Sequence, residues 1–385
     1  MPFGSGMNLF ASTVITICAL LLLFKGRSTP ARFLISACAL GILALLAIGL
    51  ANPNVVSLET GLLGLRKSGT VLLGILIGLF YQNRPNQVFQ VAWWLLILSC
   101  VGSLFLHLTM PSVEMSIVRG ADAYTSLFGG EARLQGLFPG PFHASMASAF
   151  LILLSMPDIE AELTMFQKVV GFLAGTWTLF ETEVRTGFVV VAVGAIAHFV
   201  LSSKARNWFR LLILIPLMAL FALAFSPEVR SILPNSAALT SLLSNPLDSR
   251  FTYRFTTWEQ AWDMIQSKPF LGWGPGSAGD TMGWRFPLGG HVTSHNMFLK
   301  YFVEGGALAG FFFILMLLLL AYLIFQSNHS LIGTQALLVI LLFGMTGSSV
   351  EALPVSFLLA VIIGLAASGA SKFPGPKPAT TVMAR

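Results

Sequence analysis

Residues 291–325 read HVTSHNMFLKYFVEGGALAGFFFILMLLLLAYLIF, and this stretch decides how the chain is arranged. A polar segment ends at His295 and Asn296, and an apolar run long enough to cross a bilayer follows at once. Lys300 and Glu304 stand near the start of that run. Because a charge is costly where a helix enters lipid, titratable groups at such a place are usually kept for a function. The stretch therefore predicts a membrane helix that begins beside a functional site.

The composition indicates a membrane protein. Of the 385 residues, 55% are hydrophobic and 10% are charged, and the mean hydropathy is +0.80. Apolar runs of about 17–25 residues recur along the chain, as transmembrane helices require. We predict an all-α fold, a polytopic transmembrane helical bundle of about 11–12 spans with one long periplasmic loop containing amphipathic helices. The predicted spans are 8–24, 32–50, 68–82, 88–108, 141–156, 168–184, 186–202, 209–225, 296–325, 330–347 and 353–370.

Basic residues in the short loops predict the orientation of these spans. Those after the first span, after the seventh span and in the tail fall on one side, which the positive-inside rule assigns to the cytoplasm. The N-terminus and the long loop then face outward. The formal charge of +6 is spread over these positions, so we expect no nucleic-acid partner. Arg66 and Lys67 oppose the rule, and they leave 61–65 open to a twelfth span or a re-entrant segment.

The predicted organisation has four parts. Residues 1–225 are the N-terminal transmembrane helices and 226–294 the long periplasmic loop. Residues 295–371 are the C-terminal transmembrane helices, and 372–385 form a disordered cytoplasmic tail.

The long loop contains a predicted amphipathic helix. Its apolar stripe recurs at helical spacing and consists of Phe251, Phe255, Trp258, Trp262 and Ile265. Arg250 and Arg254 lie on the neighbouring stripe, and Lys268-Pro269 ends the pattern. Such a helix is typical of one that lies along a membrane surface. We expect it to carry Arg254 over the membrane near His295.

Two arginines are candidates for binding an anion. Arg185 separates two apolar runs, and either a glutamate at 181 or 183 neutralises it or it holds a ligand. Its planar donor fork suits phosphate oxygens and stays charged at any working pH. Arg254 is either a solvated loop residue or a second anion-binding group, and Arg250 on the same face is the reserve candidate.

Histidine supplies the candidate base. Imidazole is the usual general base at neutral pH, so His295 can remove a proton from a substrate, or it can simply cap the next helix. Asn296 can orient a ligand or cap the helix, and His291 is a second candidate base ranked below His295. Glu304 lies about half a turn out of phase with His295 on a straight helix, so it is not expected to orient the imidazole.

Other chemistries lack a sequence pattern. The outward segments hold no Asp-x-Asp pair, no cluster at metal-ligand spacing and no nucleotide-type glycine loop. Cys18, Cys38 and Cys100 all fall in apolar runs. We therefore expect no metal and no cofactor. Arginines and histidine beside lipid suit a donor that carries its own leaving group, such as a lipid diphosphate.

Four motifs resemble those of the O-antigen ligase and polymerase superfamily of bacterial inner-membrane proteins. They are Arg185-Thr-Gly, Arg254-x-x-x-Trp258, Pro269-x-x-Gly272-x-Gly274, and His295-Asn296 followed by Gly306. The final position of the last motif departs from the family pattern, because Ala309 stands there and Gly310 comes one step late.

The resemblance implies a membrane glycosyltransferase that takes a glycan from undecaprenyl diphosphate on the periplasmic side. The acceptor is lipid A core in ligases and another lipid-linked glycan in polymerases. The resemblance assigns Arg185 and Arg254 to the donor diphosphate and His295 to activation of the acceptor. Candidate substrate-binding residues are Arg185, Arg254, Arg250, Asn296, His291 and Arg133. We predict an O-antigen ligase with lipid A core as the acceptor. The alternatives are an O-antigen or polysaccharide polymerase, a protein O-oligosaccharyltransferase and a non-enzymatic anion transporter, although a transporter should carry its polar groups at the midplane and here they gather at one face.

Overall fold

The protein is described from a computed structural model. The described residues are 29–81, 84–117, 127–128, 131–202, 249–280 and 282–369, and of 115–117, 127–128, 131–132 and 249–252 only the backbone is described. The predicted spans 8–24 and 209–225 and the predicted tail lie outside these ranges.

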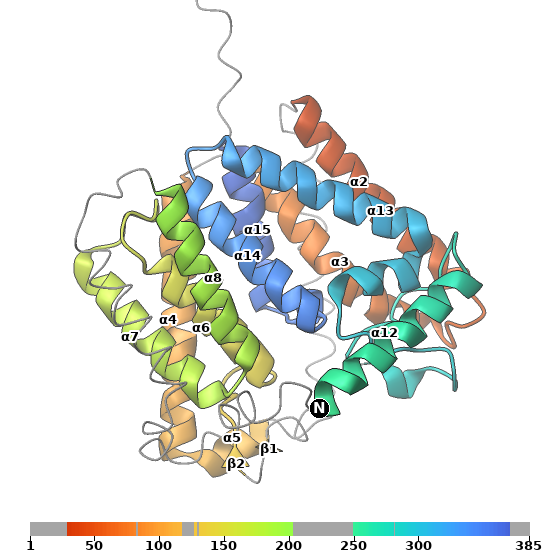
Figure 1. Cartoon of the computed structure of the whole chain (residues 1–385), viewed down its shortest axis with the longest axis horizontal. Helices are drawn as coiled ribbons and strands as arrows, with labels where there is room; N and C mark the ends of the chain where they lie inside the picture. Colours follow the sequence, from red (N-terminus) through yellow and green to blue (C-terminus); the bar gives the residue numbers. More distant parts are fainter. Residues whose placement is uncertain are drawn as a thin grey trace, which may run out of the picture.

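Within the described ranges the chain is built almost entirely of helices (Figure 1). The helices are α2 (Pro30–Ile48), α3 (Leu58–Phe80), α4 (Pro85–Thr109), α5 (Pro111–Ile117), α6 (Pro141–Leu154), α7 (Met165–Thr182), α8 (Arg185–Leu201), α12 (Ser249–Ser267), α13 (Met297–Phe325), α14 (Ser330–Thr346) and α15 (Val355–Ser368). Short 3-10 helices are η1 (Gly49–Ala51), η2 (Gly283–Arg285) and η3 (Ser349–Glu351), and β1 (Leu127–Phe128) pairs with β2 (Glu131–Ala132). The expected all-helical bundle is confirmed.

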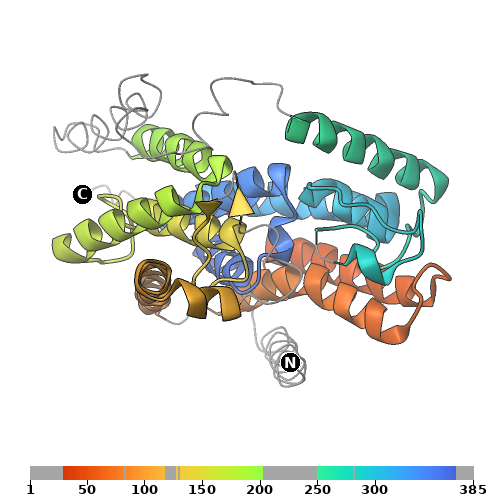
Figure 2. The same cartoon turned by 90° about the horizontal axis from the view of Figure 1, so that it is seen from below.

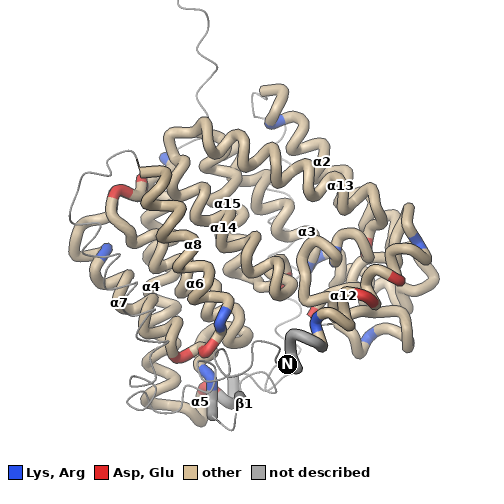
Figure 3. The backbone as a smooth tube through the Cα atoms, viewed as in Figure 1, with Lys and Arg blue, Asp and Glu red and all other residues tan. Residues whose placement is uncertain are grey.

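Several helices have the length and composition of membrane spans. Four of the described helical segments are long and apolar enough to cross a bilayer: Pro30–Ala51, Leu58–Phe80, Pro85–Thr109 and Met297–Phe325. The shorter apolar helices are α6, α8, α14 and α15. Figure 3 shows charged residues mostly near helix ends, while α14 and α15 carry none along their length. The protein is a helical membrane protein.

The helices pack in two groups that α14 and α15 join (Figure 1). One group contains α4, α6, α7 and α8, and the other contains α2, α3 and α13. Glycines allow the closest approach, between α3 and α15, because a Cβ on Gly78 would lie 2.0 Å from the Val361 carbonyl oxygen. Figure 2 shows α12 as an outer layer, with α13 and the loop beneath it and α2 and α3 on the far side.

Helix α3 corrects one prediction. It runs unbroken from its N-cap Ser57, so 61–65 is neither a twelfth span nor a re-entrant segment, and the span begins ten residues earlier than the predicted 68. Arg66 and Lys67 lower the local hydropathy, so the prediction from hydropathy left out the first turns of α3. These turns pack on the loop, because a Cβ on Gly64 would lie 2.5 Å from the backbone at Pro275 and Gly276.

Helix α13 is interrupted where the loop docks onto it. Gly306 has φ +74° and ψ −175°, which is not helical. The loop backbone supplies hydrogen bonds at this break: the amide of Ala307 donates to the Pro269 carbonyl (2.7 Å), and the amide of Trp273 donates to the Val303 carbonyl (2.8 Å). Since irregular backbone at membrane depth must be satisfied by protein, the two segments complete each other.

Gly306 and Gly310 make room for contacts other than packing against another helix. Their spacing is typical of helix–helix packing. Here a Cβ on Gly306 would lie 2.2 Å from the Phe270 carbonyl oxygen, so the glycine makes room for the loop and not for another helix. A Cβ on Gly310 would meet the ring of Phe302, which belongs to α13 itself.

We expect Gly306→Ala to destabilise the protein by about 2–4 kcal/mol, because it combines a strained backbone with a steric clash. Gly289→Ala is the matched control: φ is +77° there as well, but nothing lies within 4 Å of the added Cβ. The control should cost only about 1 kcal/mol. Unfolding by SDS titration in mixed micelles measures both, and equal losses would contradict the docking role of Gly306.

Candidate functional site

His295 and Asp280 form an acid–base pair at one end of the bundle. Nδ1 of His295 lies 3.2 Å from Oδ1 of Asp280, and each side chain keeps about a quarter of its surface exposed (26% and 28%). His295 itself has φ +43°, an unusual backbone for a residue that is not glycine. Such strain persists only when surrounding contacts hold it, and it concentrates at functional sites.

The hydrogen bonds around Asp280 keep its carboxylate ionised, so that it can accept a hydrogen bond from an imidazole N–H. Its Oδ2 accepts the amide of Ser348 (2.9 Å), and its Oδ1 accepts the Ser348 hydroxyl (3.3 Å). Burial alone raises the pKa of the Asp280 carboxyl, but the contacts with His295 and the Ser348 amide outweigh it and hold the pKa below its ordinary value. The carboxylate is therefore ionised at neutral pH. An imidazole that donates from Nδ1 to a carboxylate presents Nε2 as its basic nitrogen.

Arg185 lies at the same end of the bundle as this pair. It is the first residue of α8, and the hydroxyl of the next residue, Thr186, lies 2.9 Å from the hydroxyl of Thr346 at the end of α14. Ser348, the partner of Asp280, follows two residues later. The segment after β2 reaches this point too, because Nε of Arg133 donates to the Thr182 carbonyl (2.9 Å) just before α8.

Arg254 approaches the pair from the other side. The ring of its neighbour Tyr253 lies with its centroid 6.0 Å from that of His295, so α12 passes beside the imidazole. Arg254 is half-buried on this helix. The structure thus gathers the segments that carry Arg185, Arg254 and His295, while only the backbone of Arg250 is described.

Two further candidates have clear structural settings. Asn296 caps α13, because its Oδ1 accepts the amides of Phe298 (2.8 Å) and Leu299 (3.1 Å). Burial, and then the positive charge of Lys300, lower the pKa of His291 to about 4. The His291 imidazole is therefore neutral at pH 7 and a weaker base than an ordinary histidine.

Asp280, Ser348 and Glu351 did not stand out as candidates in the sequence. Asp280 is an isolated acid after a glycine-rich run and matches no motif by itself. Glu351 and Ser348 lie in the connection between two predicted spans, 330–347 and 353–370, which the predicted topology turns outward. The alternation of the spans therefore places Ser348 and Glu351 on the same side of the membrane as the long loop, which could have identified them as candidates. Among the described residues, no group of three His, Cys, Asp or Glu side chains is arranged to hold a metal ion.

The fold and this site define a helical membrane protein with an acid–base pair at one end of the bundle, close to the segments that carry Arg185 and Arg254. Residues 170–314 match a family model described as O-antigen ligase. This match over part of the chain supports the resemblance to the O-antigen ligase and polymerase superfamily of membrane glycosyltransferases that the motifs indicated. The matched range, 170–314, includes Arg185, Arg254, Asp280 and His295. No curated protein matches the chain.

We expect Asp280→Asn to lower the turnover of glycan transfer by roughly 10²–10⁴-fold, with little change in the KM for the donor, because the amide no longer selects the Nδ1–H form of His295. Asp263→Asn on the exposed face of α12 is the control and should leave turnover unchanged. Steady-state kinetics of both variants in detergent decide the matter. Wild-type turnover in Asp280→Asn would show that the pair of His295 and Asp280 takes no part in the reaction.

We expect the pKa of about 4 at His291 to make stability depend on pH. Between pH 6.5 and 4 the unfolded chain binds a proton that the folded protein does not, so the free energy of unfolding falls as the pH falls through this window. His291→Gln removes this proton uptake. Its melting temperature should therefore drop less than that of the wild type between pH 7 and pH 5, and equal drops would show that His291 is not buried in its neutral form.

Proposed function

We propose that this protein is an O-antigen ligase, which moves a glycan from undecaprenyl diphosphate to a hydroxyl group of lipid A core. The reaction takes place at the periplasmic face of the bacterial inner membrane. The observation that carries the proposal is the contact between His295 Nδ1 and Asp280 Oδ1 (3.2 Å) at the end of the bundle where α8 and α13 begin.

His295 acts on the acceptor in this proposal. Nε2 takes the proton of the acceptor hydroxyl as its oxygen attacks C1 of the donor sugar, which is general base catalysis. The imidazole becomes positively charged, and the ionised Asp280 beside Nδ1 stabilises that charge. The tight cap of Asn296 on α13 limits movement of the residue next to His295.

The arginines act on the donor. As the bond from C1 to the diphosphate oxygen breaks, the electron pair leaves with undecaprenyl diphosphate. Arg185 and Arg254 offset this developing charge with planar donor forks, which grip phosphate oxygens in two places. We expect Arg133, whose segment reaches the start of α8, to add positive charge near the donor, and Arg250, Asn296 and His291 remain candidate substrate-binding residues. The arginines supply the charge that a metal ion supplies in other phosphate chemistry, so transfer is expected without a metal.

The test is a reconstituted assay with purified protein, glycan linked to undecaprenyl diphosphate, and lipid A core. We expect the lipid A core to gain the mass of the glycan, with unchanged rates in EDTA. His295→Gln should lose roughly 10²–10⁴-fold in turnover. His329→Gln is the control, since this histidine lies beyond the opposite end of α13 and should leave the rate unchanged.

Each other product identifies a different activity. Longer lipid-linked glycans without modified lipid A core would make the protein a polymerase. Transfer to Ser or Thr of a protein would make it a protein O-oligosaccharyltransferase. Anion uptake into proteoliposomes without any transfer, and with His295→Gln as active as the wild type, would make it a transporter and overturn the proposal.

A further inference from the structure

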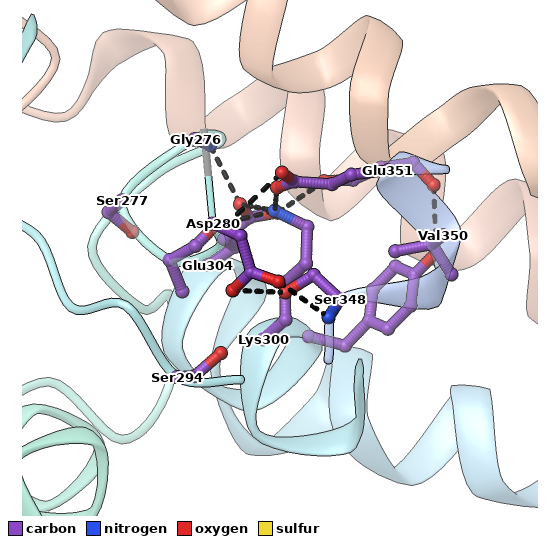
Figure 4. A network of polar contacts seen from close by, with 12 residues as sticks. Gly276, Ser277, Asp280, Ser294, Lys300, Glu304, Ser348, Val350 and Glu351 are labelled. Carbon is purple, nitrogen blue, oxygen red and sulfur yellow. Dashed lines mark hydrogen bonds and ion pairs between the residues drawn. The ribbon is translucent and has the colours of Figure 1, made fainter. Parts of the chain in front are cut away.

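A fully buried lysine lies one helical turn beyond the acid–base pair. Lys300 has no exposed surface, and its Nζ donates to Oε1 of Glu304 (2.6 Å) and to Oε1 of Glu351 (2.7 Å). The third hydrogen bond goes to the carbonyl of Ala278. The ammonium group has three N–H donors, so these contacts use all of them. Figure 4 shows Lys300 at the centre of this group, which we call the Lys300 network: Lys300, Glu304 and Glu351.

The Lys300 network binds the backbone of three alternate loop residues, Gly276, Ala278 and Asp280. Oε1 of Glu304 accepts the amide of Gly276 (2.9 Å), Lys300 binds the Ala278 carbonyl, and Oε2 of Glu351 accepts the amide of Asp280 (3.3 Å). The backbone of residues 276–280 is thus attached to α13 and η3.

Glycine is required within this attachment. Gly279 has φ +129°, and a Cβ there would lie 1.9 Å from Oε1 of Glu351 and 2.9 Å from Nζ of Lys300. The loop can approach the charged groups only because residue 279 has no side chain. The loop backbone at Gly279 is therefore in close contact with both Glu351 and Lys300.

Stability alone does not account for these charges. Replacing a buried ion pair with apolar residues of similar volume is often neutral or stabilising, and charges at the start of a membrane helix are costly. The Lys300 network also has one more carboxylate than ammonium groups. What it provides is a fixed position for Asp280, which the network holds at the amide and Ser348 holds at the carboxylate.

We propose that Lys300, Glu304 and Glu351 are positioning residues that fix Asp280 against His295. They act through Asp280 and do not contact the substrate. The proposal rests on the proposed function for its kinetic readout, while its structural readout is independent of any activity.

The test compares Glu351→Gln with Glu160→Gln. The Glu351 carboxylate accepts hydrogen bonds from both Lys300 and the Asp280 amide. Glu351→Gln keeps the shape of this side chain but removes its charge. Glu160 is a matched control, because its carboxylate also accepts backbone amides, those of Leu331 (3.1 Å) and Ile332 (3.0 Å), but at the opposite end of α14. We expect Glu351→Gln to lower kcat by about 10- to 100-fold with an unchanged donor KM, a loss of the size found when hydrogen-bond partners of metal-ligating side chains are removed. Glu160→Gln should keep the wild-type kcat.

Hydrogen exchange measured by mass spectrometry is the second readout. Peptides covering residues 274–296 should exchange faster in Glu351→Gln than in the wild type or in Glu160→Gln. Ser68→Ala is the milder variant if Glu351→Gln does not fold, because it removes only the hydroxyl that donates to Oε2 of Glu304 (2.6 Å). It should give a smaller change of the same kind in both measurements.

The outcomes separate the two proposals. If the wild-type protein transfers no glycan, the proposed function fails, and the exchange rates still decide whether the Lys300 network holds the loop. Wild-type kcat in Glu351→Gln and Ser68→Ala would overturn the positioning role. Unchanged loop exchange would overturn it as well, even with a reduced kcat.

Discussion

The need to satisfy every backbone polar group inside a membrane governs this structure. A continuous helix meets that need by itself, but α13 is interrupted at Gly306 and leaves hydrogen-bonding groups open. The loop from Pro269 to Gly274 fills the gap with its own backbone groups. The break therefore serves as an attachment point, and it brings a segment outside the spans against the helix that begins beside His295.

The site follows from this attachment. Once Pro269–Gly274 is docked at the break, the next residues run back along α13 toward its N-terminus, where Lys300 and Glu304 hold them. Asp280 arrives beside His295, and Ser348 from the α14–α15 connection completes its contacts. Local helix chemistry supports the arrangement, because the Asn296 cap fixes where α13 starts.

Sequence reasoning reached the spans and part of the site. Hydropathy placed 88–108 and 330–347 within a few residues of α4 and α14, because those runs are apolar throughout. It failed at the start of α3, where two basic residues interrupt the apolar run without ending the helix. His295 stood out because it precedes a membrane span. Asp280 did not, since its importance comes from contacts with residues 15 and 68 positions away along the chain. Such pairings leave no periodicity for a sequence pattern to detect.

The contact between Asp280 and Ser348 has a consequence for how the protein is made. Membrane proteins are inserted from the N-terminus as they are synthesised. His295 is already in place when α13 enters the membrane, but Ser348 and Glu351 emerge only after α14. A nascent chain paused before that connection has its imidazole without a fixed carboxylate. The Asp280 carboxylate and amide therefore gain their contacts with Ser348 and Glu351 only after α14 has been made.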